Sequence, residues 1–125
     1  MLMKKKLEDL INQKIFIIDG AMGTALQERN LTAADFGGEE YDGCNEYLVI
    51  TRPDVIQEIH EDYLAAGADI VETNTFGGTN FVLGEYDLED KVEEVNTKAV
   101  QLARAACEKY STDDKPRFVA GAMGP

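Results

Sequence analysis

Apolar runs at three places along the chain predict three short strands. Residues 15–18 are continuously apolar and stop at an Asp-Gly pair, which is typical of a parallel strand buried on both faces. Residues 70–71 are β-branched, follow a glycine and lead into polar residues, and residues 118–121 form a third apolar run. The pattern therefore predicts three buried strands, each followed by a polar or glycine-containing loop.

Helical spacing of apolar residues occupies the segments around these strands. Residues 4–13 carry apolar side chains three and four positions apart, which predicts a short amphipathic helix that packs on a larger body. A second helix is predicted to begin with Thr51 as its capping residue and Pro53 in its first turn, and to end at Gly67.

The clearest helical pattern spans residues 88–110. Residues 79–86 predict a short helical turn, and residues 21–27 are compatible with a helix after the first strand. Residues 30–47 break every pattern and predict a loop of about eighteen residues, a length at which loops often carry function. The apolar face of the long helix is predicted to contain Leu88, Val92, Val95, Ala99, Leu102, Ala103 and Ala106.

Strands that alternate with helices and end in glycine-rich segments indicate an α/β fold with a parallel sheet and right-handed crossovers. Three short strands do not complete a parallel sheet, and no helical pattern follows the third one. We therefore expect about three βα units that form the first part of a larger barrel or open sheet, with residues 1–14 as an N-terminal helical extension.

Composition narrows the class of protein. Hydrophobic residues make up 44% of the chain and charged residues 29%, which is ordinary for a soluble globular protein. The net charge of −12 argues against nucleic acid or an anionic membrane as a partner, because both require a basic surface. No signal peptide and no apolar stretch of roughly 18 residues is present, so we expect a cytoplasmic protein.

Cysteine and histidine residues give no metal-binding pattern. Cys44 and Cys107 lie far apart without Cys-x-x-Cys or Cys/His spacing, and we interpret them as free thiols in a reducing compartment. His60, the only histidine, follows Ile56 by one helical turn, and we interpret it as a surface or packing residue rather than a base or ligand. The chain is therefore expected to contain no metal site.

Polar residues follow the first two predicted strands. In a parallel α/β fold the carboxyl ends of the strands meet at one edge, where ligands bind. Asp19 is expected at this edge after the first strand, and Glu72, Thr73, Asn74 and Thr75 after the second. A polar ligand site and a self-satisfied network of turn residues both fit this cluster, and Asp19 alone fits a ligand-binding or a helix-capping role.

These stretches resemble the homocysteine S-methyltransferase family. The similarity begins at residue 16, keeps the family's order and spacing, and lies closest to the homocysteine-binding domain of larger members that use cobalamin or include a methylenetetrahydrofolate reductase. The residues that carry it are 19–24 (DGAMGT), 45–56 (NEYLVITRPDVI), 59–60, 63–64, 66–77 (AGADIVETNTFG) and 119–125 (VAGAMGP).

The resemblance implies a (β/α)8 barrel of the TIM type that binds homocysteine at the carboxyl ends of its strands. It also implies a zinc ion, bound by three cysteines, that holds the substrate sulfur as a thiolate for methyl transfer to give methionine. The methyl donor would be cobalamin or a folate, reached through other domains. In the family the zinc cysteines belong to later strands, so zinc would bind in the full-length parent outside this chain.

The resemblance also assigns substrate-binding residues. Asp19 and Gly20, with Ala21 beside them, match positions that meet the amino group and backbone of homocysteine, where a carboxylate would pair with an ammonium. Residues 73–76 (Thr73, Asn74, Thr75 and Phe76) match the end of the second strand, where structural support of the site is as expected as substrate contact. No residue of the chain is expected to be catalytic.

Two functional hypotheses follow for residues 1–125. The first is an N-terminal fragment of a homocysteine S-methyltransferase, inactive alone. The second is a stand-alone interaction module whose exposed strand edges pair with another copy or with a separate part of a barrel. A different barrel enzyme, such as an aldolase, is disfavoured because no lysine stands at a strand end and no phosphate-binding loop is present.

Overall fold

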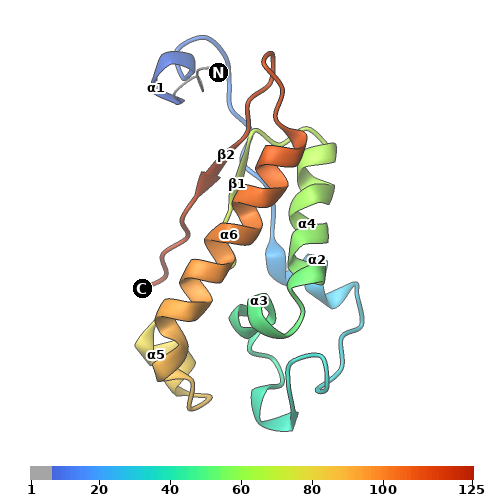
Figure 1. Cartoon of the computed structure of the whole chain (residues 1–125), viewed down its shortest axis with the longest axis vertical. Helices are drawn as coiled ribbons and strands as arrows, with labels where there is room; N and C mark the ends of the chain where they lie inside the picture. Colours follow the sequence, from blue (N-terminus) through green and yellow to red (C-terminus); the bar gives the residue numbers. More distant parts are fainter. Residues whose placement is uncertain (1–6) are drawn as a thin grey trace.

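The computed structural model describes residues 7–125, in which helical elements precede the first strand and separate it from the second (Figure 1). Positions 4–6 of the predicted first helix lie outside the described residues. The elements are α1 (Leu7–Leu10), α2 (Met22–Gln27), η1 (Glu39–Tyr41), η2 (Asn45–Tyr47), α3 (Leu48–Thr51), α4 (Pro53–Ala65), β1 (Ile70–Glu72), α5 (Asn80–Gly84), η3 (Glu89–Lys91), α6 (Val92–Tyr110) and β2 (Phe118–Ala120).

The sheet is parallel, as the sequence predicts. β1 pairs with β2 in a register that places Val71 opposite Val119. On the other edge of β1, the 15–18 segment forms a parallel bridge between Ile18 and Ile70. The backbone order is therefore 15–18, β1, β2, which is the order in which these segments occur in the sequence.

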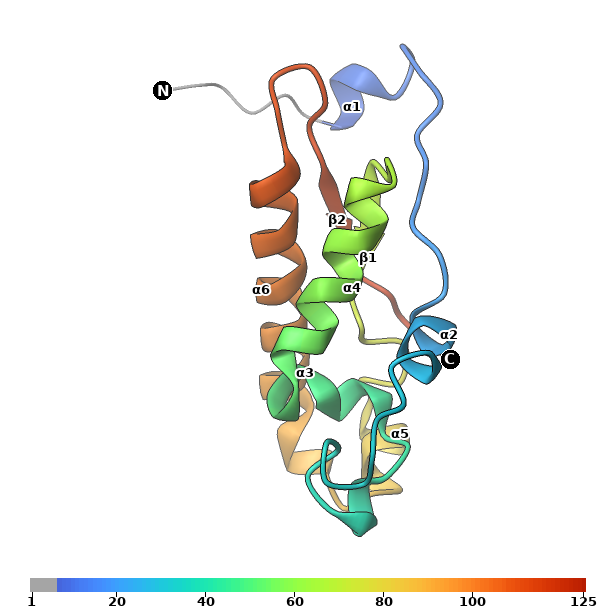
Figure 2. The same ribbon diagram turned by 90° about the vertical axis from the view of Figure 1, so that its right-hand side faces the viewer.

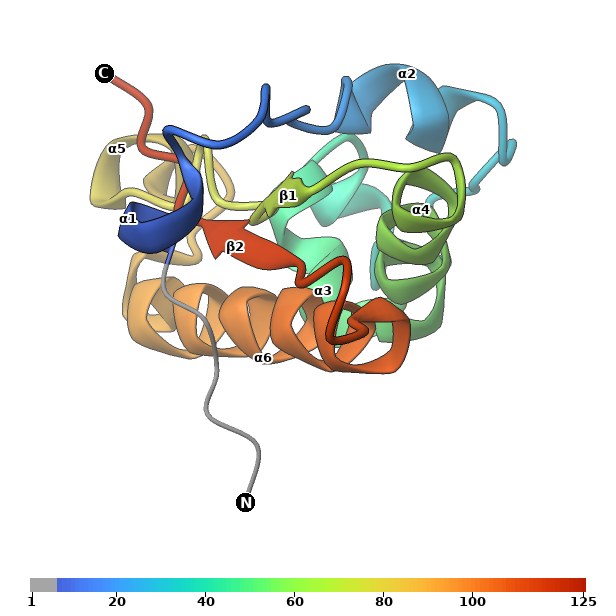
Figure 3. The same cartoon turned by 90° about the horizontal axis from the view of Figure 1, so that it is seen from above.

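The prediction that residues 15–18 form a fully buried strand is wrong. The segment makes an isolated bridge instead of a ladder, and Ile15, Ile17 and Ile18 are 87%, 56% and 54% exposed. The reason is its place at the sheet edge: α4 and α6 pack against β1 or β2, while the 15–18 segment lies on the opposite side of β1 from β2. Figure 3 shows α6 running along one side of the two strands.

Asp69 connects all three segments of the sheet at the start of β1. Its carboxylate is 2% exposed and accepts hydrogen bonds from Lys14 Nζ at 2.6 Å and from the Ile17 N–H at 3.0 Å. Its own N–H donates to Ile17 O at 2.8 Å, and its carbonyl accepts from the Phe118 N–H at 2.8 Å. Burial alone would raise the pKa of Asp69, but these donors hold that pKa below its ordinary value.

The first helix is shorter than predicted. Within the described residues, α1 spans Leu7–Leu10 and contains no buried residue, and Ile11 is 56% exposed. An isolated helix of one turn is not stable by propensity alone, and this one lacks an apolar face packed on a larger body. The expectation of a packed amphipathic helix is therefore wrong for residues 7–13.

The start of α4 differs from the prediction in its cap. Pro53 occupies the first turn, as expected, but Thr51 is the last residue of α3 and its buried Oγ1 has no hydrogen-bond partner. Arg52 holds the junction instead, because its guanidinium bonds both Asp54 and Asp35. The end of α4 is as predicted: Gly67 adopts a φ of +113°, which favours glycine.

The hydrogen bonds after α4 form a Schellman motif, in which the Ala68 N–H donates to Tyr63 O and the Gly67 N–H to Leu64 O. Arg117, just before β2, also donates to the Leu64 and Ala68 carbonyls at 2.6 and 2.9 Å. These bonds satisfy carbonyl groups at the helix end and fix the start of β1 against β2.

The core lies between α4 and α6, which run side by side (Figure 2). The predicted helix over 88–110 is confirmed as η3 and α6, and Val92 of its predicted apolar face is only partly buried. Lys109 on α6 pairs with Glu61 on α4 at 2.5 Å along the rim. The residues of the predicted face that are buried are Leu88, Val95, Ala99, Leu102, Ala103 and Ala106.

The 30–47 segment is a long connection, as expected, with two short helical turns, η1 and η2, inside it. Phe36 and Cys44 anchor it in the main apolar core, and Tyr41 and Tyr47 pack edge to face at 5.1 Å. The predicted turn over 79–86 is confirmed as α5, where the Thr79 hydroxyl accepts from the Val82 N–H.

Within residues 7–125, no helix has the length and apolar character needed to cross a membrane.

The exposed isoleucines next to an unpaired backbone edge predict self-association. Extended backbone with exposed apolar side chains pairs with other chains, so the 125-residue chain should form concentration-dependent oligomers. Light scattering after size-exclusion chromatography at several concentrations measures this. Ile17→Lys should lower the apparent mass, and Ile11→Lys, which changes an equally exposed isoleucine outside the sheet, should not. Monomeric wild-type chain at every concentration would contradict the prediction.

Candidate functional site

Asp19 lies where the first segment leaves the sheet. Its N–H donates to Ile70 O at 2.9 Å, and its Oδ1 accepts from the Glu72 N–H at 3.1 Å. It does not cap the next helix, because the residue at the N-cap of α2 is Ala21 and no side chain caps that helix. Burial raises the pKa of Asp19 to about 6, with the nearby Glu72 carboxylate adding to the shift and the Glu72 N–H opposing it.

Tyr63 of α4 packs against the two residues that follow Asp19. Its hydroxyl donates to Ala21 O at 2.8 Å. A Cβ on Gly20 would lie 3.0 Å from the Tyr63 ring and hydroxyl, so only glycine fits this close approach without a shift of the ring. The sequence places Tyr63 on the apolar stripe of α4, and its spacing gives no sign of this second contact.

Thr73 and Thr75 together hold the backbone that follows β2. The Thr75 hydroxyl donates to Ala122 O at 2.7 Å, and the Ala122 N–H donates to the Thr73 hydroxyl at 3.1 Å. The two hydroxyls lie 2.7 Å apart. Because the single proton of Thr75 is directed at Ala122, Thr73 must be the donor between the two threonines.

The side chain of Asn74 is buried in the protein, whereas that of Phe76 faces solvent. Asn74 is buried, and its Nδ2 donates to Asn45 O at 2.9 Å, which joins the end of β1 to η2. Phe76 is 64% exposed. Of residues 73–76, the three polar ones therefore bond within the protein, and Phe76 presents its ring to solvent.

The next two residues are held by side chains from distant elements. The Gly77 N–H donates to Glu46 Oε1 at 3.0 Å, and Asn96 Nδ2 of α6 donates to Gly78 O at 2.8 Å. Sequence reasoning did not assign a role to Glu46 or Asn96. No local pattern could have done so, since each bonds a backbone group 31 or 18 residues away.

The cysteines and the histidine behave as packing residues. Cys44 and Cys107 are free and buried, and burial raises the pKa of both thiols, that of Cys107 to about 11. His60 is fully buried, and neither ring nitrogen has a hydrogen-bond partner. Within the described residues no cluster of three His, Cys, Asp or Glu side chains could hold a metal ion.

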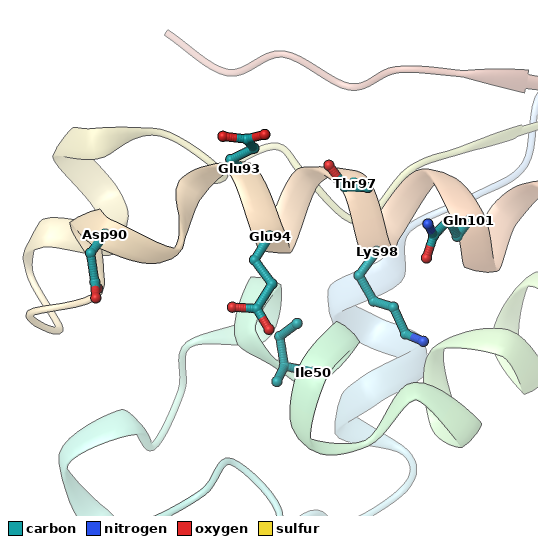
Figure 4. Close-up of a pocket in the computed structure, with 7 residues that line it drawn as sticks. All are labelled: Ile50, Asp90, Glu93, Glu94, Thr97, Lys98 and Gln101. Atoms are coloured by element: carbon teal, nitrogen blue, oxygen red, sulfur yellow. The ribbon is translucent and has the colours of Figure 1, made fainter.

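A shallow groove of about 580 Å³ lies between α3 and α6 (Figure 4). It is rich in acidic side chains, and none of its lining residues belongs to the strand ends. Figure 4 shows Glu94 and Lys98 on the side of α6 that faces Ile50. The lining residues are Ile50, Asp90, Glu93, Glu94, Thr97, Lys98 and Gln101.

Comparison with known proteins assigns the chain to a family. The pattern that defines the family described as homocysteine S-methyltransferase matches residues 16–125. The chain belongs to this family. This membership confirms the resemblance seen in the sequence motifs.

Relatives within the homocysteine S-methyltransferase family are close. The chain is 47% identical over 117 residues to proteins named methionine synthase from Mycobacterium tuberculosis and from Mycobacterium leprae. The alignment covers 94% of this chain and 10% of each relative. The chain therefore spans about a tenth of the length of the curated relatives it matches.

Solved structures support the fold. The crystal structure of the homocysteine methyltransferase MmuM from Escherichia coli, metallated form, matches 95% of this chain with a TM-score of 0.77 and 30% identity. The oxidized form gives a TM-score of 0.78 and 31% identity. The chain covers 41% and 40% of those two structures, so its small parallel sheet and flanking helices correspond to part of a homocysteine methyltransferase.

The threonine pair gives a prediction for stability. Thr75→Val removes the hydroxyl that bonds Ala122 and Thr73 and leaves buried polar groups without a partner, so the free energy of unfolding should fall by about 1–3 kcal/mol. Urea denaturation measures the change. Thr97→Val, at an exposed position of α6, should stay within about 0.5 kcal/mol of wild type. Equal effects of the two substitutions would contradict the hydrogen-bond assignment.

His60 gives a prediction for pH dependence. Burial lowers its pKa from 6.5 to about 4, so the unfolded chain binds a proton between these values that the folded chain does not. The contribution of His60 to the unfolding free energy should be fully present above pH 6.5 and should fall as the pH drops toward 4, by on the order of 3 kcal/mol. The difference in unfolding free energy between wild type and His60→Leu isolates this term, since Asp19 titrates in both. A difference that does not change with pH would contradict it.

Proposed function

We propose that these residues form the first part, about three βα units, of a (β/α)8 barrel whose strand ends bind homocysteine. The protein that contains them would transfer a methyl group to the homocysteine thiolate and form methionine. Family membership and the similarity to a homocysteine methyltransferase support the reaction class. The alternative of a stand-alone assembly module has no support in the comparisons, since the relatives above carry the names of enzymes.

The observation that carries the proposal is the placement of Asp19. Its carboxylate lies at the end of the 15–18 segment, bonded to the last residue of β1, and makes no ion pair among the described residues. A half-buried carboxylate in this position can bind an ammonium group through a charge-assisted hydrogen bond. The α-amino group of homocysteine is the proposed partner.

The other predicted residues divide into two roles. Thr73, Asn74 and Thr75 would support the site, because their polar groups already bond Ala122 and Asn45. Phe76 would contact the substrate with its exposed ring. The substrate's own thiolate would be the nucleophile. Its electron pair would form the new S–C bond, and the electron pair of the broken bond between the methyl group and its donor would stay on the donor.

Zinc does not fit the residues of this chain. Cys44 and Cys107 are buried in different apolar clusters, and no set of three ligands is present among the described residues. The zinc ligands, and a cobalamin or folate methyl donor, would therefore be supplied by other parts of the protein. We assign no activation of the thiol to residues 7–125.

Calorimetric titration of L-homocysteine into the chain tests the role of Asp19. We expect weak binding to the wild-type chain and roughly tenfold weaker binding to Asp19→Asn, because the variant keeps the shape and loses the charge. The affinity of the wild-type chain should also fall as the pH drops below about 6, where Asp19 becomes protonated, and should level off near that of Asp19→Asn. Asp113→Asn, at an exposed site between α6 and β2, is the matched control. Equal affinity in wild type and Asp19→Asn would refute the assignment.

A further inference from the structure

Every residue of the loop from Asn74 to Gly78 except Phe76 makes a hydrogen bond to another residue, and the Phe76 carbonyl packs closely on Gly124. Thr75 on one side bonds Ala122, and Gly77 on the other side bonds Glu46. Gly78 is fixed through its carbonyl by Asn96, and its own N–H donates to Thr75 O at 2.9 Å. The exposed ring of Phe76 therefore stands between two residues whose backbone or side chain is held in place.

Glu46 makes the anchor on the side after Phe76. It lies in η2, and its partly buried carboxylate accepts the Gly77 N–H at 3.0 Å. A Cβ on Gly77 would lie 2.7 Å from the same oxygen and 2.9 Å from Val82. The carboxylate thus packs directly on the Gly77 backbone, and only glycine fits here without a shift of Glu46 or Val82.

The same short element supplies a second bond to this loop. Asn45 O, next to Glu46, accepts from the Asn74 side chain at 2.9 Å. η2 therefore holds the loop at both ends, before and after Phe76. A carboxylate hydrogen bond to a backbone N–H is stronger than a neutral one, so Glu46 contributes the stronger of the two bonds.

We propose that Glu46 is a positioning residue, which fixes the Gly77 backbone and thereby the direction of the Phe76 ring at the strand ends. The inference rests on the proposed function, because it assigns Phe76 to the homocysteine site. Glu46 itself faces a backbone amide and needs no contact with substrate. Its loss would act on binding through the loop and leave the Asp19 carboxylate in place.

The test combines amide hydrogen exchange with homocysteine titration in the 125-residue chain. Glu46→Ala should raise the exchange rate of residues 76–78 and weaken homocysteine binding by about five- to tenfold. Glu46→Gln keeps an oxygen acceptor at the same position, so it should restore most of the protection and of the affinity. Glu39→Ala, an exposed glutamate of η1, is the matched control and should change neither.

The outcomes separate this inference from the proposed function. If wild type binds and Glu46→Ala binds equally well, the positioning role is wrong while the homocysteine site stands. If Glu46→Ala exchanges as wild type does, the Gly77 bond does not hold the loop and the inference is overturned. If wild type itself gives no heat and Asp19→Asn is indistinguishable from it, the proposed function fails and this inference fails with it. A joint loss that Glu46→Gln reverses supports it.

Discussion

The sheet depends on the hydrogen bonds of Asp69, whose carboxylate is buried. The Asp69 backbone bonds the 15–18 segment through Ile17 and β2 through Phe118, and the Asp69 side chain bonds Lys14. A buried carboxylate without partners costs several kcal/mol, so the three segments assemble where these donors are available. Asp69 thus fixes the register of the three segments at their starting ends, and this register sets which residues meet at their carboxyl ends.

At the opposite end of the sheet, Asp19 also bonds a neighbouring segment, but it has no cationic partner there among the described residues. Its carboxylate accepts the N–H of Glu72. Asp69 is therefore held ionised by Lys14, whereas Asp19 has a raised pKa. The aspartates at opposite ends of the sheet thus have opposite electrostatic roles: Asp69 holds the sheet together, and Asp19 has the unpaired charge that a ligand site requires.

Sequence reasoning predicted the features that depend on local periodicity. β1, β2 and the long helix follow from apolar spacing, and the end of α4 follows from Gly67. It was wrong about burial at residues 15–18, because an apolar run does not reveal whether a second layer covers it. It also assigned the cap of α4 to Thr51, although the Arg52 guanidinium holds that junction by bonds that no pattern encodes.

The candidate site shows the same division: its strand-end residues could be located in the sequence, and the side chains that hold them, such as Tyr63, could not.

The threonine pair has a consequence for how the strand ends respond to charge. Ala122 accepts from Thr75 and donates to Thr73, so the hydroxyl proton between the threonines has one possible orientation. The chain of dipoles is ordered before any ligand arrives. A charged molecule that entered this region would meet dipoles that do not have to reorient around it. Water molecules would have to reorient, and this part of the fold avoids that energetic cost.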